Sequence, residues 1–172
     1  TFHAENIATQ LANNGAFNCN ATRVLITHAG WPQREEFLDA LRHAYAHIPQ
    51  RHPYYPGARE RFDRWVGANA AHAETYGINS EKLLPWALIT DLDPEDEDNL
   101  LQKAVAFCND TLWGTLNAAM IIDPDTEAAD ADALDQAIDD LRYGSVVINH
   151  WPALSYGFGV TAWGAYPGHT YQ

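Results

Sequence analysis

The sequence is poor in positive charge. Only 10 residues are Lys or Arg against 23 that are Asp or Glu, so the formal net charge of the 172-residue chain is -13. Attraction between basic side chains and phosphate dominates non-specific binding to nucleic acids and to anionic membranes. The charge balance therefore argues against both as partners. Long hydrophobic runs are also missing, since no apolar stretch approaches the roughly 20 residues that a membrane-spanning helix needs.

Cysteine is scarce as well. Cys19 and Cys108 are the only two, and neither belongs to a C-x-x-C pair. Two cysteines cannot build a disulfide framework, so we expect a reducing, cytoplasmic setting. The chain has no signal-peptide pattern after Thr1, and its last stretch, 161–172, closes no regular element. We therefore expect it to be a piece of a longer protein.

Short apolar runs alternate with amphipathic ones along the chain. Strands are predicted at 23–28, 84–90, 115–122 and 144–149, and helices at 2–13, 32–47, 58–72, 100–110 and 132–141. The predicted strands are nearly uniformly apolar, which is typical of strands buried in a parallel sheet. The pattern predicts a single α/β domain with a mostly parallel sheet flanked by helices.

Cys19 is the first candidate for chemistry. It lies in a loop of small residues, 15–22, between a predicted helix and a predicted buried strand. Loops beside a sheet often carry reactive groups, and a thiolate there can act as a nucleophile. The alternative is a small buried hydrophobic residue. Cys108 falls in the middle of a predicted helix, where we expect it to pack in the core.

Histidines are the second set of candidate functional residues, as possible metal ligands. His43 and His47 are four residues apart on a predicted helix, with Asp39 one turn earlier and His52 in the following loop. Such a pair can bind a metal ion, but a solvated helix face is the expected role, so no metal site is predicted. The acidic run 91–98 lacks the Gly and Glu positions of a calcium loop and is predicted to be a solvated linker.

Four motifs occur in a fixed order. They are Asn13-Asn14-Gly15 followed by a loop cysteine and an Arg-led strand, then 107–116 (FCNDTLWGTL), 141–149 (LRYGSVVIN) and 162–168 (AWGAYPG). Together they resemble the aldehyde dehydrogenase superfamily. The second motif is similar to that family's A-N-D-T-x-Y-G-L passage, the third to its L-x-x-G-x-V-x-V-N passage, and the fourth stands where the family has P-F-G-G-x-K-x-S-G.

The resemblance implies an incomplete catalytic domain of an NAD(P)-dependent aldehyde dehydrogenase. In that family a cysteine thiolate attacks the aldehyde, hydride leaves to the nicotinamide, and a thioester remains. Carried over here, Cys19 is the nucleophile and its backbone N–H is an oxyanion donor. Trp163 and Tyr166 are then near the substrate mouth. The partner is a small aldehyde, and the full-length protein is expected to be a homo-oligomer.

Two departures from the family pattern matter. The family's spacing from Cys to Arg is one residue longer, so counting back from Arg23 puts Asn18 at the nucleophile position. Either Cys19 still reaches the site, or the protein is an inactive relative that serves in assembly or ligand binding. The family's ribose-binding Glu motif is also absent before residue 100, which predicts a missing segment near residue 99. The dinucleotide-binding domain and the general base would lie before Thr1, so the chain alone is not expected to oxidise aldehydes.

Overall fold

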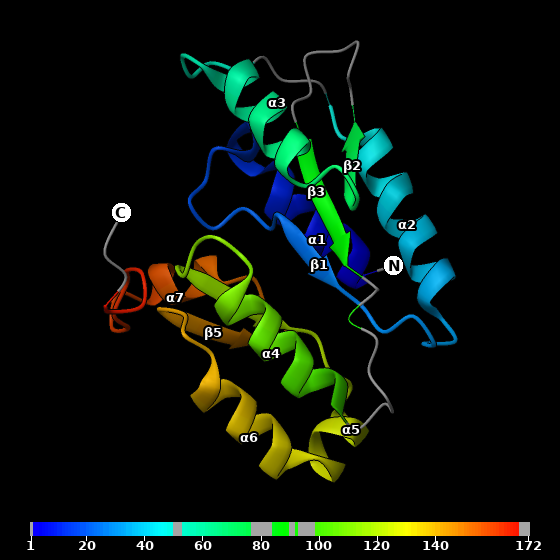
Figure 1. Cartoon of the computed structure of the whole chain (residues 1–172), viewed down its shortest axis with the longest axis vertical. Helices are drawn as coiled ribbons and strands as arrows, with labels where there is room; N and C mark the ends of the chain where they lie inside the picture. Colours follow the sequence, from blue (N-terminus) through cyan, green and yellow to red (C-terminus); the bar gives the residue numbers. More distant parts are fainter. Residues whose placement is uncertain (1, 50–52, 77–83, 90–91, 93–98, 169–172) are drawn as a thin grey trace. The chain divides into compact units, whose positions relative to one another are not determined.

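The chain forms two compact units, residues 1–91 and 92–172 (Figure 1). The computed structural model describes residues 2–49, 53–76, 84–89, 92 and 99–168. His52 and nearly all of the acidic run 91–98 lie outside the described residues, as does most of the chain that leads up to residue 99. None of the helices in the described ranges is long and apolar enough to cross a membrane.

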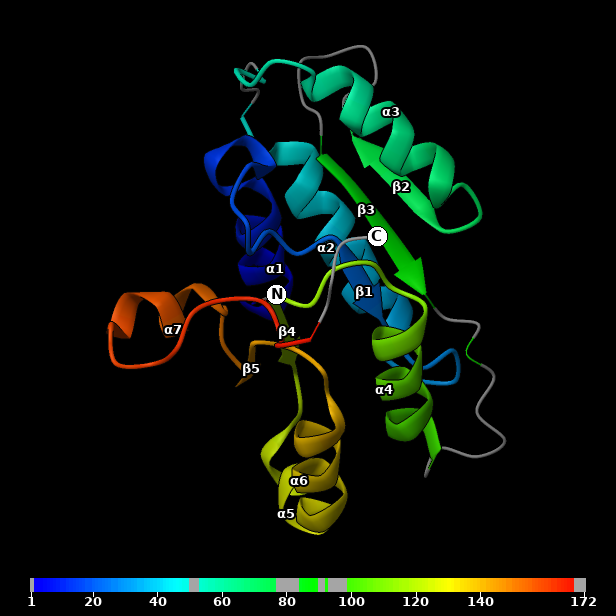
Figure 2. The ribbon, with the colours of Figure 1, turned by 60° about the vertical axis from the view of Figure 1, so that its left-hand side comes forward.

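Unit 1 is a three-stranded sheet covered by helices. Its elements are α1 (Phe2–Ala12), η1 (Asn13–Ala16), β1 (Val24–Ile26), α2 (Arg34–His47), α3 (Ala58–Ala68), β2 (Ala73–Tyr76) and β3 (Leu84–Ile89). The strand order is β1-β3-β2, in which β1 runs parallel to β3 and β2 runs antiparallel to it. Figure 2 shows α3 on one side of this sheet and α1 and α2 on the other.

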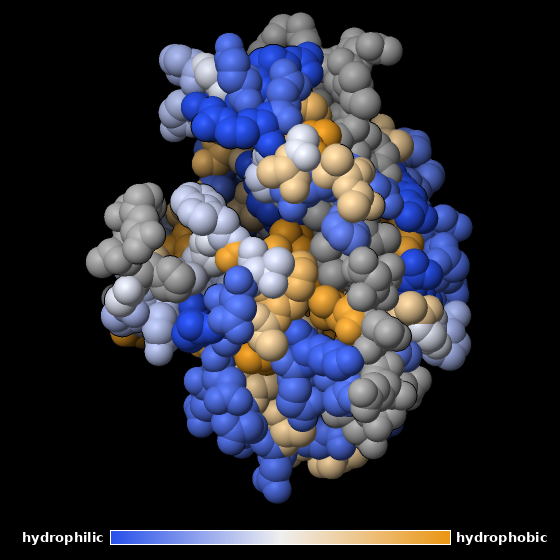
Figure 3. All heavy atoms as spheres, viewed as in Figure 1, coloured by the Kyte–Doolittle hydropathy of each residue, from blue (hydrophilic) through white to orange (hydrophobic). Residues whose placement is uncertain are grey.

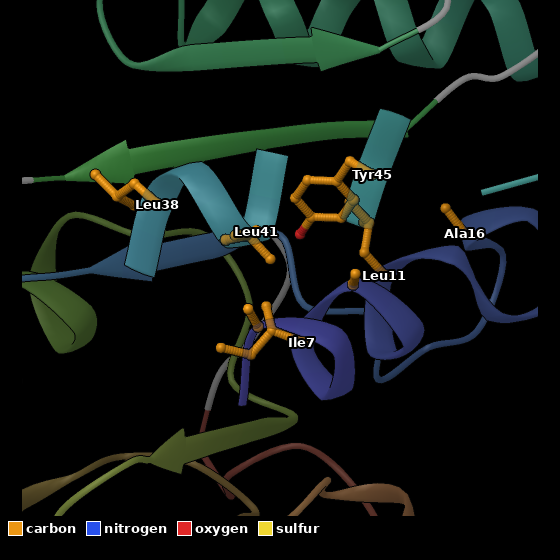
Figure 4. Packing of buried hydrophobic residues seen from close by; sticks show 8 residues of the cluster. Ile7, Leu11, Ala16, Leu38, Leu41 and Tyr45 are labelled. Atoms are coloured by element: carbon orange, nitrogen blue, oxygen red, sulfur yellow. The ribbon is translucent and has the colours of Figure 1, made fainter. Parts of the chain in front are cut away.

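The core of unit 1 lies between α1 and α2. Ile7 and Leu11 are one turn apart on α1, and Leu38, Leu41 and Tyr45 follow the same helical spacing on α2. All five are buried, and Figure 4 shows Leu41 and Tyr45 of α2 directed toward the side chains of α1. The helix predicted at 32–47 therefore buries one face against α1.

Unit 2 is a two-stranded parallel sheet with its own helices. Its elements are α4 (Leu100–Asp110), β4 (Asn117–Met120), α5 (Pro124–Ala129), α6 (Ala131–Asp140), β5 (Ser145–Ile148) and α7 (Ala153–Phe158). Val105 of α4 and Ala137 of α6 are buried together with Leu141. Hydrophilic side chains cover the outer faces of α3 in unit 1 and α6 in unit 2 (Figure 3).

Two asparagines fasten the elements of unit 2. Asn149, in the left-handed conformation with φ 58°, accepts from the Ile122 N–H at 2.9 Å and donates to the Ile122 carbonyl at 2.8 Å. Asn109 donates to the Asp140 carbonyl and accepts from the Arg142 N–H, both at 2.8 Å. Asn109 belongs to the second sequence motif and Arg142 to the third, so their hydrogen bond joins the two motifs. The bond from Asn109 to Asp140 holds α4 against the end of α6.

The predicted α/β class is confirmed, with three differences of detail. The strand predicted at 23–28 is shorter, and its residues are half-buried rather than buried, since β1 has only β3 as a neighbour among the described strands. The strand β2 and the helices α5 and α7 were not predicted. Of these, α5 does carry a signal, because Asp123 accepts from the Asp125 and Thr126 N–H groups as an N-cap before Pro124.

The α1–α2 core gives a direct test of the fold. Leu38 is fully buried, so Leu38→Ala should lower the free energy of unfolding by about 2–5 kcal/mol through lost burial and a residual cavity. Glu36→Ala on the exposed face of the same helix should change it by less than about 0.5 kcal/mol. Urea unfolding followed by circular dichroism measures both, and equal losses would contradict this description of the core.

Candidate active site

The loop that carries Asn18 and Cys19 begins with a left-handed turn at the end of α1. Asn14, Gly15 and Ala16 have φ of 54°, 63° and 65°. Glycine takes this conformation freely and asparagine tolerates it, but for alanine it costs about 1–2 kcal/mol. The helix predicted at 2–13 thus ends at this turn, and Ala16 carries the conformational strain that follows it.

Two contacts hold Ala16 in this conformation. Its methyl group is 2% exposed and belongs to the α1–α2 core. Its carbonyl accepts a hydrogen bond from the Arg23 guanidinium, which reaches back across the loop. Burial lowers the pKa of Arg23, and the nearby Tyr45 offsets part of that effect. Arg23, from which the nucleophile position is counted in the sequence, therefore anchors the loop through this hydrogen bond.

The far end of the loop is tied to α1 through a buried side chain. The Thr22 hydroxyl donates to Oε1 of Gln10 at 2.6 Å, and Nε2 of Gln10 donates to Oδ1 of Asn6 at 2.7 Å. Gln10 is only 2% exposed. Because the oxygen and the nitrogen of its amide each have a hydrogen-bond partner, these bonds offset the cost of burying the group, and Gln10 fixes the loop.

Asn18 and Cys19 differ in what their side chains do. Nδ2 of Asn18 donates to Oδ1 of Asn13 at 2.8 Å, so the amide is engaged and half-buried. The Cys19 thiol is exposed and unpaired, and neither it nor the Cys19 N–H bonds to any described residue. The alternative that Cys19 is a small buried hydrophobic residue is wrong. The loop offers an accessible thiol next to an unengaged backbone donor.

An aromatic cluster lies beside the entry to this loop. The ring of Phe17 meets Tyr54 and Tyr55 edge-on, with centroids 5.1 and 4.7 Å away. The Tyr54 hydroxyl donates to Oδ1 of Asn14 at 2.8 Å. No pattern in the sequence indicated this contact, since the tyrosines lie in a proline-rich loop 40 residues away.

Trp163 and Tyr166 lie in unit 2, whereas Cys19 and Asn18 lie in unit 1. Trp163 packs against Tyr156 with centroids 5.5 Å apart, and the Tyr166 N–H donates to the Thr115 carbonyl at 3.1 Å. The backbone of this segment passes so close to Gly144 that a Cβ there would lie 1.7 Å from the Gly164 oxygen. Their place at a substrate mouth stays a prediction.

The remaining candidates have structural surroundings. Cys108 is half-buried and packs against the core of unit 2, as predicted. His43 and His47 are exposed with ring centroids 4.1 Å apart, and Nδ1 of His47 lies 2.8 Å from the His43 carbonyl. Asp39 forms an ion pair with Arg42. In the part of the chain that the structure describes, no three His, Cys, Asp or Glu side chains are grouped to hold a metal ion.

Solved structures of aldehyde dehydrogenases share this fold. A gamma-glutamyl-gamma-aminobutyraldehyde dehydrogenase from Burkholderia cenocepacia superposes with a TM-score of 0.57, and an NAD-dependent aldehyde dehydrogenase from Sinorhizobium meliloti with 0.53. Both are 16% identical in sequence and cover 87% of this chain. The chain spans only about a third of their length, 35% and 34%.

No protein-family model matches the sequence, and no curated protein matches it either. The similarity therefore rests on three-dimensional structure. It confirms the predicted α/β fold class, in which a small sheet flanked by helices matches part of the aldehyde dehydrogenase fold.

The described residues do not form a site for NAD(P). A dinucleotide needs backbone N–H groups and polar side chains that converge on its phosphates and riboses. The buried polar atoms left without a hydrogen bond include the Thr27 hydroxyl and Nε of Arg34 in unit 1 and the Ser145 hydroxyl and Nε1 of Trp151 in unit 2. They are divided between the two units, two in each.

The two cysteines should differ in reactivity. Burial raises the pKa of the Cys108 thiol to about 11, so at pH 8 roughly one such group in a thousand is a thiolate. We expect iodoacetamide to label the exposed Cys19 at least about 50-fold faster than Cys108. Peptide mass spectrometry over a time course measures both rates in one sample, with Cys19→Ser and Cys108→Ser to assign them. Comparable rates would show that Cys19 is shielded.

Alkaline pH should destabilise unit 2. Burial raises the pKa of Cys108 from 9.0 to about 11 and that of Tyr143, beside Cys108, from 10.0 to about 12. The folded state therefore retains protons that the unfolded chain has released, and the free energy of unfolding falls as pH rises above 9. Each group contributes a slope of at most about 1.4 kcal/mol per pH unit.

Urea unfolding between pH 8 and 11 measures this slope. Cys108→Ala should flatten it between pH 9 and 11, where the thiol titrates in the folded and unfolded states. Val105→Ala removes a buried neighbour that does not titrate, so it should lower stability equally at every pH. Identical slopes for the two variants would rule out Cys108 as a source of the pH dependence.

Proposed function

We propose that this chain is the catalytic-domain portion of an NAD(P)-dependent aldehyde dehydrogenase and that Cys19 is its nucleophile. The single observation that carries the proposal is the exposed Cys19 thiol on a loop anchored at both ends. Arg23 holds the entry at Ala16, and Gln10 holds the exit at Thr22. The fold shared with aldehyde dehydrogenases supports the same chemistry.

The first step follows from these residues. The Cys19 thiolate adds to the carbonyl carbon of a small aldehyde, a C–S bond forms, and the electron pair of the C=O bond moves to oxygen. The Cys19 N–H, which bonds to no described residue, is available to that oxyanion. Because no described base contacts the thiol, its activation is assigned to groups outside the described residues.

The later steps depend on parts of the protein outside this chain. We assign NAD or NADP to a separate dinucleotide-binding domain, since the described residues do not fit that cofactor. The proposal treats the 172 residues as one partial domain of a homo-oligomeric protein, with a segment lost near residue 99. The two free cysteines favour a reducing compartment, for which the cytoplasm is the proposed location.

A second function has its own supporting observation. Asn18 stands at the family's nucleophile position, and its amide is engaged with Asn13 rather than directed at a ligand. An amide cannot replace a thiolate as a nucleophile, so this geometry also suits an inactive relative that serves in assembly or ligand binding.

Aldehyde-dependent formation of NADH or NADPH by the full-length protein separates the two functions. Cys19→Ser should reduce kcat/KM at least about 1000-fold, because the covalent intermediate cannot form. Asn18→Ala should retain activity within about tenfold, since in this proposal Asn18 only supports the loop. Cys108→Ser is the matched control and should leave turnover unchanged.

If the protein is the inactive relative, the opposite results are expected. The full-length protein would then show no turnover with any aldehyde, and Cys19→Ser would change nothing. Asn18→Cys would place a thiol at the family's nucleophile position, and activity gained by that variant alone would establish the alternative.

A further inference from the structure

Tyr54 connects two distant parts of the chain. Its hydroxyl donates to Oδ1 of Asn14, the first residue of the left-handed turn, across 40 positions of sequence. Its ring packs against Tyr55 with centroids 4.6 Å apart and the ring planes tilted by 33°, and Phe17 meets both rings in an edge-to-face arrangement. Phe17 is the last residue before Asn18 and Cys19.

We propose that Tyr54 is a positioning residue for the loop that carries Cys19. Its contacts with Asn14 and Phe17 hold the left-handed turn in a single conformation. That conformation sets the direction in which the Cys19 side chain points. The consequence for catalysis rests on the function proposed above, whereas the effect on the loop does not.

The turn needs such support because its conformation is unfavourable. Asn14 and Ala16 are non-glycine residues with positive φ, and residues of this kind persist only where the surroundings over-determine them. Arg23 and the buried methyl of Ala16 restrain the end of the turn. Tyr54 restrains its start, where the Asn14 side chain is exposed.

The side chain of Tyr54 is itself 57% exposed and lies outside the α1–α2 core. Loss of its hydroxyl should therefore loosen the loop and leave the core intact. This separation makes the role testable, because a merely structural residue would alter the stability of the whole unit instead.

Two backbone hydrogen bonds report on the loop. The Phe17 N–H donates to the Asn14 carbonyl and the Ala21 N–H donates to the Asn18 carbonyl, both at 3.2 Å. Tyr54→Phe keeps the ring and removes only the hydroxyl. We expect it to speed the amide hydrogen exchange of Phe17 and Ala21 about fivefold, with the amides of α2 unchanged, as measured by NMR.

Tyr55→Phe is the matched control. The Tyr55 hydroxyl bonds to no described residue, so the same chemical change should leave exchange at Phe17 and Ala21 within about twofold of the wild type. Equal effects of the two variants, or no effect of either, would overturn the proposal whether or not the protein is an enzyme.

A second measurement tests the catalytic consequence in the full-length protein. Tyr54→Phe should lower kcat about tenfold with little change in KM, because a misplaced nucleophile loses attack geometry rather than substrate binding. Alkylation of Cys19 by iodoacetamide should stay within about twofold, since that reagent needs only an exposed thiol. Unchanged kcat in a protein that Cys19→Ser inactivates would refute the positioning role. Absence of turnover in the wild type would refute the proposed function alone, because the exchange measurement still decides the role of Tyr54.

Discussion

The left-handed conformation of Ala16 is the constraint on which unit 1 depends. Its methyl group is part of the core between α1 and α2, and its carbonyl accepts a hydrogen bond from Arg23, the residue just before β1. One residue therefore links the hydrophobic core, the first strand of the sheet and the loop with the thiol. Glycine would relieve the strain at this position, but it would also remove a buried methyl group and widen the range of conformations open to the turn.

In unit 2, side-chain hydrogen bonds hold the elements together, whereas in unit 1 buried apolar side chains do so. Its sheet has only two strands among the described residues, and two parallel strands make few ladder bonds. Asn149 compensates by pairing with both backbone groups of Ile122, which continues the β4–β5 pairing past the last strand residue. Asn109 likewise bonds to two backbone groups, and it connects α4 to the segment that leads into β5. These asparagines belong to the sequence motifs that resemble the family, so those motifs specify the fold rather than the chemistry.

The sequence predicts elements that bury apolar residues at a regular spacing. The helix 32–47 was predicted for this reason, and the strand 144–149 because it is nearly uniformly apolar. The structure has α2 at Arg34–His47 and β5 at Ser145–Ile148, although the residues of β5 are half-buried rather than buried. β2 was missed because it is short and carries Glu74, whose carboxylate binds Arg42 on α2 with distances of 2.8 and 3.1 Å. An ion pair between residues that are far apart in the sequence produces no periodic hydrophobic pattern. The contact of Tyr54 with Asn14 was missed for the same reason, whereas Cys19 could be singled out from its loop and its type alone.

For the exposed thiol, a fixed position and chemical activation are separate requirements. A loop anchored by Arg23 and Gln10 can fix the position of Cys19, but position alone does not make a thiol nucleophilic. Lowering the barrier to thiolate formation requires a base or a positive charge, and no described residue supplies one to Cys19. The described loop thus fixes the position of the thiol, and under the proposed function its activation and the acceptance of hydride are assigned to groups outside the described residues. Under that proposal a rigid loop matters for Cys19, because a small displacement of the attacking sulfur costs attack geometry.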